Sequence, residues 1–234
     1  KKGHFDPSPL FSSREYLFLN ADVAAAKMNP LTHYENWGWK ENRLMSFTTI
    51  KTPTFPDGTV SINKILNSRT NFKNKKVSVF ASFSGNGKIE SNVIYLLKGL
   101  NEISDYIVFV SDNPIFEEEI EKIKPYCNYC IFSRHEEYDF GSYKRGYQYL
   151  IENDILQKED DLIFVNDSCY GPVYPFSEVI EDYNRKDCDF YGLSLGQIYT
   201  EHIQSFFYIF KSKVYLSEVF RNFVNSITCQ MGSG

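Results

Sequence analysis

Short apolar runs alternate with amphipathic segments along most of the chain, from residue 77 onward. Apolar runs predict strands, and segments with apolar residues three or four positions apart predict helices. The predicted strands span residues 77–83, 106–110, 130–132, 161–165, 190–193 and 203–210. The predicted helices span residues 90–101, 115–124, 142–153, 176–184 and 213–223. This alternation predicts an α/β domain with a mostly parallel, Rossmann-like sheet that carries helices on both faces.

Residues 1–47 differ from the rest of the chain because they contain both tryptophans and an alanine run, Ala24 to Ala26, inside a helical pattern. Asn20 and Asp22 are predicted caps before that run, and Asn29-Pro30 is expected to end it and begin a second helix. This segment is therefore predicted to be a small helical appendage.

A segment rich in Thr, Pro and Lys follows at residues 48–76 and is predicted to be a linker. The chain is accordingly divided into a helical appendage (1–47), a linker (48–76) and one α/β domain (77–234).

Composition narrows the classes of function. With 25 Lys and Arg against 30 Asp and Glu, the net charge is −5, so no bulk positive field favours a nucleic-acid partner. No uninterrupted apolar stretch approaches about 18 residues, and no transmembrane segment is expected.

An odd number of cysteines, five, and the lack of an apolar segment near Lys1 that could act as a signal peptide indicate a reduced, cytoplasmic protein. Aromatic residues make up 17% of the chain, which favours an aromatic core over stacking on sugars or bases.

Ligands of such sheets bind beyond the carboxyl ends of the strands, so the loops that follow strands hold the candidate site. The first is Ser84-Gly85-Asn86-Gly87-Lys88, where Ser84 and Lys88 are candidates for binding a phosphate and a plain turn is the alternative. Asp139, after the third strand, either accepts hydrogen bonds from a nucleobase or ribose or caps the next helix. Lys144 and Arg145, in the first turn of that helix, are candidates for binding a diphosphate.

The fourth strand runs directly into Asn166, Asp167 and Ser168. An amide and a carboxylate at a sheet edge suit a divalent cation, Mg²⁺ or Mn²⁺, that bridges two phosphates, although a single carboxylate needs the substrate's phosphates or a second ligand to complete the shell. His202 and Gln204 alternate onto one face of the last predicted strand. His202 is a candidate metal ligand or general base, with a structural role as the alternative.

Four blocks of sequence resemble the rhamnan synthesis F family of bacterial glycosyltransferases, in the same order and at similar spacing. They are Tyr138 to Gly146, Val165 to Pro172, Asp189 to Leu193 and His202 to Phe207, within a resemblance that covers about residues 77–226. The resemblance implies a GT-A-like fold and transfer of a sugar, typically rhamnose or a related deoxysugar, from a nucleotide-diphosphate donor such as a dTDP-sugar. It also implies that the acceptor is a growing cell-surface polysaccharide or a lipid-linked molecule. The protein is then expected to be located at the inner face of the cell membrane.

The resemblance also implies roles for single residues. Asp139 and Gly141, and Asn166 to Ser168, stand where GT-A enzymes hold the donor, and Gln204 is added to that set. GT-A enzymes usually carry Asp-x-Asp, whereas only Asp167 is acidic here, so a weakly bound or dispensable metal is an alternative to a firmly held one. Asp167 and His202 are the implied metal ligands.

The catalytic assignments follow from the reaction that the resemblance implies. The site must stabilise negative charge on the leaving diphosphate and, if the configuration is inverted, deprotonate the acceptor hydroxyl. Asp167 is the candidate for the first task, and His202 or Glu201 for the second. The alternative is a catalytically inactive module that binds a sugar nucleotide or glycan.

Two further expectations follow from the resemblance. The appendage is similar to a small helical module found beside polysaccharide glycosyltransferases, and the α/β domain is expected to be cut at its C-terminal end, as one segment of a longer glycosyltransferase. Aromatic residues inside the resembling blocks are expected to stack on base or sugar, namely Tyr138, Phe140, Tyr143, Tyr170, Phe206 and Phe207.

Overall fold

The computed structural model describes residues 11–38, 40, 41, 43, 58–61 (backbone only), 74–197 and 200–228. The chain divides after residue 52 into two compact units. Part of the predicted linker belongs to the sheet of the second unit, because Gly58–Ser61 forms strand β1 and pairs antiparallel with β4 (Tyr129–Phe132).

The first unit is helical, as predicted. It contains α1 (Ser13–Leu19), α2 (Ala21–Ala25), α3 (Pro30–His33) and the π-helical turn η1 (Tyr34–Gly38). Asn29 caps α3 by accepting a hydrogen bond from the Thr32 backbone N–H at 3.0 Å, which confirms the start of the second predicted helix. A buried contact of 2.9 Å joins the Tyr16 hydroxyl to Nδ1 of His33 within a small apolar core.

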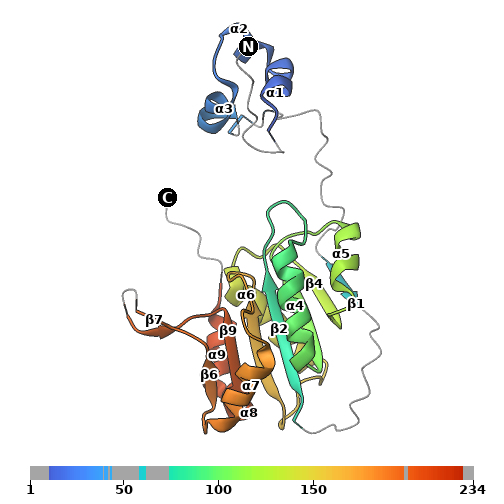
Figure 1. Cartoon of the computed structure of the whole chain (residues 1–234), viewed down its shortest axis with the longest axis vertical. Coiled ribbons are helices and arrows are strands. Elements are labelled where there is room, and N and C mark those ends of the chain that lie inside the picture. The colour runs from blue at the N-terminus through green and yellow to red at the C-terminus, as the bar shows by residue number, and fades with distance from the viewer. Residues whose placement is uncertain are drawn as a thin grey trace. The chain divides into compact units, whose positions relative to one another are not determined.

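Within the described residues, the second unit contains a seven-stranded sheet in the order β1-β4-β3-β2-β5-β9-β6 (Figure 1). The remaining strands are β2 (Lys76–Ser82), β3 (Tyr106–Ser111), β5 (Asp161–Asn166), β6 (Phe190–Gly192) and β9 (Phe207–Lys211). Strands β4, β3, β2 and β5 are parallel neighbours, whereas β1 and β9 are antiparallel to theirs. A separate hairpin pairs β7 (Leu195–Gly196) with β8 (His202–Ile203).

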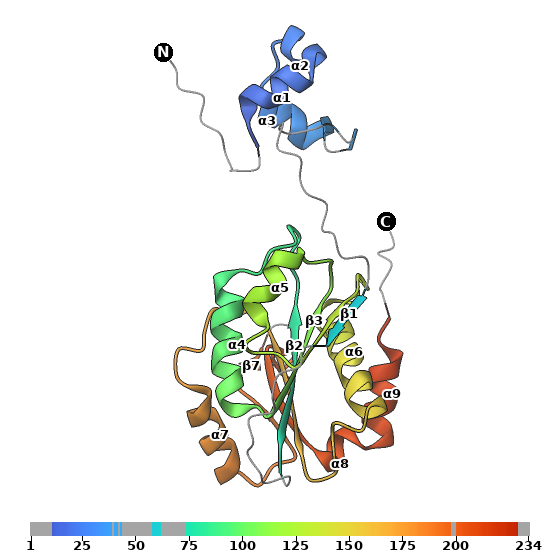
Figure 2. The same ribbon diagram turned by 90° about the vertical axis from the view of Figure 1, so that its right-hand side faces the viewer.

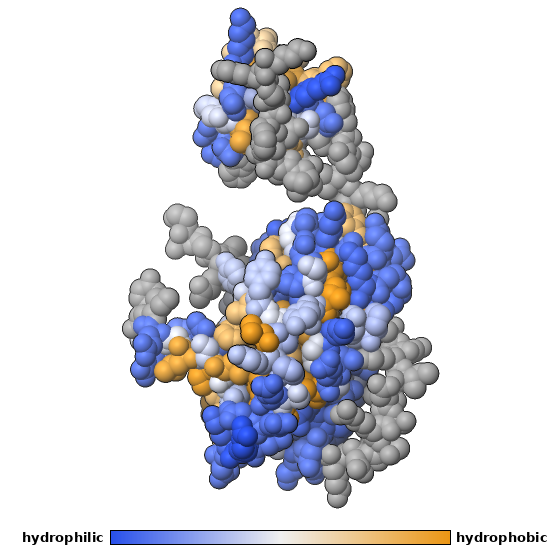
Figure 3. All heavy atoms as spheres, in the orientation of Figure 1, coloured by the Kyte–Doolittle hydropathy of each residue, from blue (hydrophilic) through white to orange (hydrophobic). Residues whose placement is uncertain are grey.

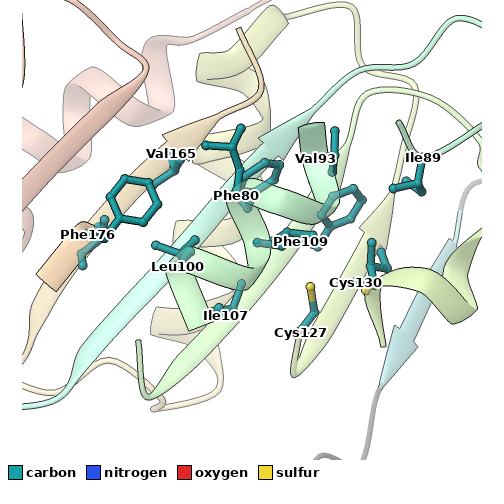
Figure 4. Packing of buried hydrophobic residues seen from close by; sticks show 14 of the residues in the cluster. Phe80, Ile89, Val93, Leu100, Ile107, Phe109, Cys127, Cys130, Val165 and Phe176 are labelled. Carbon is teal, nitrogen blue, oxygen red and sulfur yellow. The ribbon is translucent and has the colours of Figure 1, made fainter. Parts of the chain in front are cut away.

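Helices cover both faces of this sheet (Figure 2). One face carries α4 (Ser91–Ile103), α5 (Glu117–Ile123) and α7 (Phe176–Arg185), and the other carries α6 (Tyr138–Glu152), α8 (Ser212–Tyr215) and α9 (Glu218–Ser226). Successive residues of β2 enter opposite cores, since Phe80 packs beneath α4 (Figure 4) and Val79 packs beneath α6. The predicted mostly parallel α/β architecture is thus confirmed. Among the described residues, no helix is both long and apolar enough to cross a membrane.

Two predicted elements are divided in the structure. The strand predicted at residues 203–210 is interrupted between β8 and β9, where the Phe206 carbonyl accepts a hydrogen bond from the Asn166 N–H at 3.2 Å. The helix predicted at residues 213–223 is split into α8 and α9 because Ser217 caps a new helix, accepting from the Phe220 N–H at 3.1 Å.

Helix α6 begins at Tyr138 rather than at Ser142 as predicted. His135 fixes this start, because its Nδ1 accepts a hydrogen bond from the Glu137 N–H at 3.1 Å and its Nε2 lies 3.0 Å from the Ser142 hydroxyl. Burial lowers the pKa of His135, which keeps the ring neutral and its Nδ1 able to accept. The earlier start places Asp139 within the first helical turn, so it is not the helix cap.

The close approach of α6 to β2 depends on Gly146. A Cβ added there would overlap both methyl groups of Val79, a fully buried residue of β2. We expect Gly146→Ala to destabilise the fold by about 1–3 kcal/mol, because overpacking outweighs the roughly 1 kcal/mol that alanine gains over glycine inside a helix. Urea unfolding measures the difference. Gly85→Ala is the matched control, since a Cβ at position 85 meets nothing nearer than 3.9 Å, and an equal loss in both variants would contradict this account.

Candidate functional site

The Asp167 carboxylate is held at the carboxyl end of the central strands. Its Oδ2 atom accepts a hydrogen bond from the Ser82 hydroxyl at 2.7 Å and another from the Phe83 N–H at 3.2 Å. Ser82 ends β2, and Asp167 follows the end of the parallel neighbour β5. The two strand ends therefore fix one carboxylate oxygen and its orientation.

A second carboxylate reaches the same place from the first turn of α6. The Asp139 Oδ2 atom accepts a hydrogen bond from the Asn166 side-chain amide at 2.6 Å. The other end of that amide, Oδ1, accepts from the Ser168 N–H at 3.1 Å. Asn166 is buried and cannot turn freely, so it ties Asp139 to the loop that carries Asp167. The structure thus brings together Asp139, Asn166, Asp167 and Ser168, which the sequence analysis placed at the donor. We call Asp139, Asn166 and Asp167 the carboxylate cluster.

The carboxylate cluster holds more negative charge than its surroundings favour. Burial, reinforced by the charge of Asp167, raises the pKa of Asp139 to about 6 against the pull of the Asn166 hydrogen bond. Burial also raises the pKa of Asp167, while the bonds from Ser82 and Phe83 act in the opposite direction. A proton or a cation would relieve this repulsion, so the cluster is suited to bind either.

The donor set of the carboxylate cluster fits a divalent cation whose remaining ligands come from substrate. Mg²⁺ in proteins is commonly bound by one or two carboxylates together with substrate phosphates. Among the residues that the structure describes, no group of three His, Cys, Asp or Glu side chains could hold a metal by itself. The structure therefore does not add His202 to Asp139 and Asp167 as a third ligand.

The other catalytic candidates lie on the β7–β8 hairpin, which projects from the sheet (Figure 1). Glu201, His202 and Gln204 are all exposed. The His202 ring and the Gln204 side chain both face Gly196 of β7, which confirms that they share one face. His202 Nδ1 lies 2.9 Å from the Thr200 carbonyl. Their exposure contrasts with the half-buried carboxylates of Asp139 and Asp167, and the roles of these side chains toward acceptor and donor stay predictions.

Lys144 and Arg145 both contact Glu137, so neither cation is unpaired, and their assignment to a diphosphate stays a prediction. The Arg145 guanidinium lies 2.5 Å from the Glu137 carboxylate, and the Lys144 ammonium lies 3.4 Å from it. Lys144 also donates to the Ile227 carbonyl at 2.6 Å, just beyond α9. Acting against burial, these two cations lower the pKa of Glu137. The structure thus gives Lys144 and Arg145 a part in holding α6, and Glu137 is the partner that sequence reasoning missed.

Gly141 has a packing reason to be glycine. A Cβ at this position would overlap Cβ of Glu137 and lie 2.6 Å from Nδ1 of His135. The contact of Gly141 with a donor stays a prediction, whereas its lack of a side chain lets the start of α6 pack closely on Glu137 and His135.

The loop after β2 is held as a turn by its neighbour strand. The Ser84 N–H donates to Oδ1 of Asn113 at 2.9 Å, and the Ser84 hydroxyl donates to Oδ1 of Asn86 at 2.7 Å. Asn86 also accepts from the Lys88 N–H at 2.9 Å, and the Lys88 side chain is exposed. These hydrogen bonds hold the loop in a turn and join it to Asn113, which follows β3. Binding of a phosphate by Ser84 and Lys88 stays a prediction.

The aromatic residues of the resembling blocks divide by burial. Tyr143 and Phe207 are fully buried in the two cores, and Phe140 packs edge-on against Tyr143 and Phe223, so stacking of these rings on a ligand is not supported. Phe206 is half-buried against the core beneath α4 and α7.

Three residues close in sequence to the carboxylate cluster carry exposed aromatic rings. Tyr138 precedes Asp139 and is 83% exposed, and Tyr170 follows the Asp167 loop and is 88% exposed. Phe83, whose N–H donates to Asp167, is 64% exposed and was missed by sequence reasoning, although its position as the last residue of the first predicted strand could have identified it. Of the six predicted stacking residues, only Tyr138 and Tyr170 are exposed, and Phe83 joins them.

The chain is similar in sequence to proteins from bacteria. The chain is 29% identical over 123 residues to the uncharacterized protein y4gN of Sinorhizobium fredii, covering 51% of this chain and 30% of that protein. It is 29% identical over 156 residues to the virulence protein VirA of Vibrio anguillarum, covering 65% of this chain and 48% of VirA. The chain thus spans about a third to a half of the length of these relatives. Among solved structures, a 4-diphosphocytidyl-2C-methyl-D-erythritol synthase matches 68% of this chain and 82% of its own, with 13% identity and a TM-score of 0.45.

The family comparison covers the region that holds the carboxylate cluster. The profile of the rhamnan synthesis protein F family matches residues 107–231, more than half of the chain, and this range contains Asp139, Asn166 and Asp167. The chain therefore belongs to the rhamnan synthesis protein F family.

Proposed function

We propose that the α/β domain is a glycosyltransferase that binds a nucleotide-diphosphate sugar at the carboxyl ends of β2 and β5. The observation that carries the proposal is the carboxylate cluster. In a sheet of this class the ligand crevice lies at these strand ends, and Asp139 and Asp167 meet there through Asn166. Membership in a rhamnan synthesis family supports a polysaccharide as the product.

The leaving diphosphate needs positive charge, and the two basic residues first assigned to it are paired elsewhere. Lys144 and Arg145 both contact Glu137. A divalent cation, when bound, supplies that charge to the diphosphate, and Asp167 would hold it together with the diphosphate oxygens. Ser82 and Asn166 keep the two carboxylates in place before the donor arrives.

Proton removal from the acceptor hydroxyl has a candidate inside the carboxylate cluster. Because its pKa is raised to about 6, Asp139 is ionised at neutral pH yet is a stronger base than an ordinary aspartate. Glu201 and His202 remain candidates on the exposed hairpin. The proposed donor sugar is rhamnose or a related deoxysugar carried by dTDP, on the strength of the family.

The proposal is tested by measuring which nucleotides bind and which donors turn over. We expect dTDP, UDP or GDP to raise the unfolding temperature of the full chain more in the presence of Mn²⁺ than in EDTA, since the cation binds together with the diphosphate. The matching nucleotide sugar is expected to be hydrolysed or transferred in the same metal-dependent way. Binding without hydrolysis or transfer to any acceptor would support a non-catalytic binding module, and no binding of any nucleotide would overturn both.

A further inference from the structure

An apolar cavity of about 350 Å³ opens beside the carboxylate cluster. Its inner wall is formed by core residues of β5, α7 and β9, namely Val165, Phe176 and Phe207. Its rim is formed by the loop after β5 and the end of β6, namely Tyr170, Val173, Tyr174 and Leu193, which are all exposed. Figure 3 shows apolar side chains gathered on the neighbouring β7 hairpin and at its base. The core beneath α7 is thus open to solvent at this point.

The lining of this cavity selects against a charged or richly hydroxylated occupant. None of its lining residues is an acid or a base, and its amide, hydroxyl and thiol groups are contributed by Asn166, Cys169, Tyr170 and Tyr174. The Asn166 amide is already bonded to Asp139 and Ser168. A sugar ring buried here would leave hydroxyl groups without partners, each at a cost of about 1–3 kcal/mol. A hydrocarbon incurs no such cost and gains from leaving water.

The position of the cavity connects it to the reacting groups. Asn166 lines the cavity and also binds Asp139, so an occupant of the cavity ends next to the carboxylate cluster. A ligand with a hydrocarbon end in the cavity and a polar end at Asp139 and Asp167 would match both environments. An acceptor hydroxyl attached to a hydrocarbon chain has this composition.

We propose that the cavity binds the hydrocarbon part of a lipid-linked acceptor, next to the hydroxyl that receives the sugar. The proposal rests on the proposed glycosyltransferase function and selects between the two acceptor types considered from sequence, a free polysaccharide and a lipid-linked molecule. In this proposal the donor lies at the carboxyl ends of β2 and β5, next to Asp167, and the hydrocarbon chain of the acceptor lies in the cavity beside α7.

The test uses a series of n-alkyl β-D-glucosides, from methyl to octyl, below the concentrations at which they form micelles. Affinity for the full chain is measured by titration calorimetry without any nucleotide. We expect about fourfold tighter binding for each methylene that enters the cavity, and no further gain once the cavity is full. Equal affinity for methyl and octyl glucoside would overturn the proposal.

Two exposed valines provide a matched pair of variants. Val173 is 84% exposed at the rim of the cavity, and Val219 is 80% exposed on α9 and does not line it. Val173→Asp is expected to weaken octyl glucoside binding at least about tenfold, because the carboxylate must be desolvated against the chain. Val219→Asp is expected to leave binding unchanged. Equal effects of both variants would overturn the proposal. A change of oligomeric state in Val173→Asp alone would also overturn it, because a second copy of the chain would then be the occupant of the cavity.

The outcomes separate this proposal from the proposed function. Dependence on chain length without turnover of any donor would contradict the transferase function and leave the hydrocarbon site standing. Turnover with equal rates and affinities across the glucoside series would contradict the hydrocarbon site alone.

Discussion

Asp167→Asn and Asp167→Ala are expected to lower sugar transfer by about 100- to 1000-fold, the effect of losing a preorganised charged group at a developing charge. The folded state should survive both changes. Burial raises the pKa of Asp167, so removing its charge relieves desolvation, and an asparagine oxygen can still accept from the Ser82 hydroxyl, which is now 2.7 Å from the carboxylate. Transfer rates measured beside thermal unfolding separate the two effects.

Asp187→Asn is the matched control for this prediction. Asp187 is an exposed aspartate between α7 and β6, remote in sequence from every strand end that forms the carboxylate cluster. It is expected to keep both the wild-type rate and the wild-type unfolding temperature. Wild-type turnover in a folded Asp167→Ala protein would contradict the role assigned to the carboxylate. A loss of rate accompanied by a large fall in unfolding temperature would show that Asp167 supports the fold instead.

The placement of Asp139 and Asp167 at one edge could be predicted from sequence. Apolar runs alternating with helices imply parallel strands, and parallel strands end together at the same edge. Asp139 and the Asn166-Asp167 pair each follow such a strand, and a 2.6 Å hydrogen bond from Asn166 to Asp139 joins them. The prediction that these residues share one edge of the sheet requires only the local apolar pattern of each strand. It does not require knowledge of which side chains contact one another.

The partners themselves could not be predicted, because periodicity describes only local sequence. Ser82 binds Asp167 across 85 positions, and no local feature of either residue indicates the other. From sequence, Lys144 and Arg145 are candidates for binding a phosphate. In the structure both contact Glu137, the residue that precedes α6. The division of residues 203–210 has the same origin, since the turn there is fixed by long-range hydrogen bonds from Asn166 and Tyr143.

Asp139→Asn is expected to change stability and activity in opposite directions. The pKa of Asp139 is about 6 in the folded protein and 3.8 ordinarily, so the folded state binds the proton more tightly than the unfolded state. Ionisation of Asp139 therefore lowers the free energy of unfolding. The loss is zero well below pH 4 and reaches at most about 3 kcal/mol above pH 6, because each unit of difference between the two pKa values corresponds to about 1.36 kcal/mol. Asparagine removes this cost and can still accept from Asn166. The variant should be more stable than wild type at pH 8, and its advantage should shrink as the pH falls from 6 toward 4.

Activity should respond in the other direction, because the donor site and the proposed base both need the ionised carboxylate. Wild-type kcat/KM, which reports the pKa of the free protein, is expected to fall by half near pH 6 and about tenfold for each further pH step below it, as Asp139 takes up a proton. Asp139→Asn should lose transfer at all pH values. Urea unfolding and initial rates between pH 4 and pH 8 measure both quantities in the same preparations, with Asp187→Asn as the control. A stability gain that is the same at pH 4 and pH 8 would mean that the substitution repacks the start of α6 and that the raised pKa of Asp139 has no part in the gain. Full activity in Asp139→Asn would exclude Asp139 from the reaction. Proton transfer would then be left to the hairpin residues Glu201 and His202.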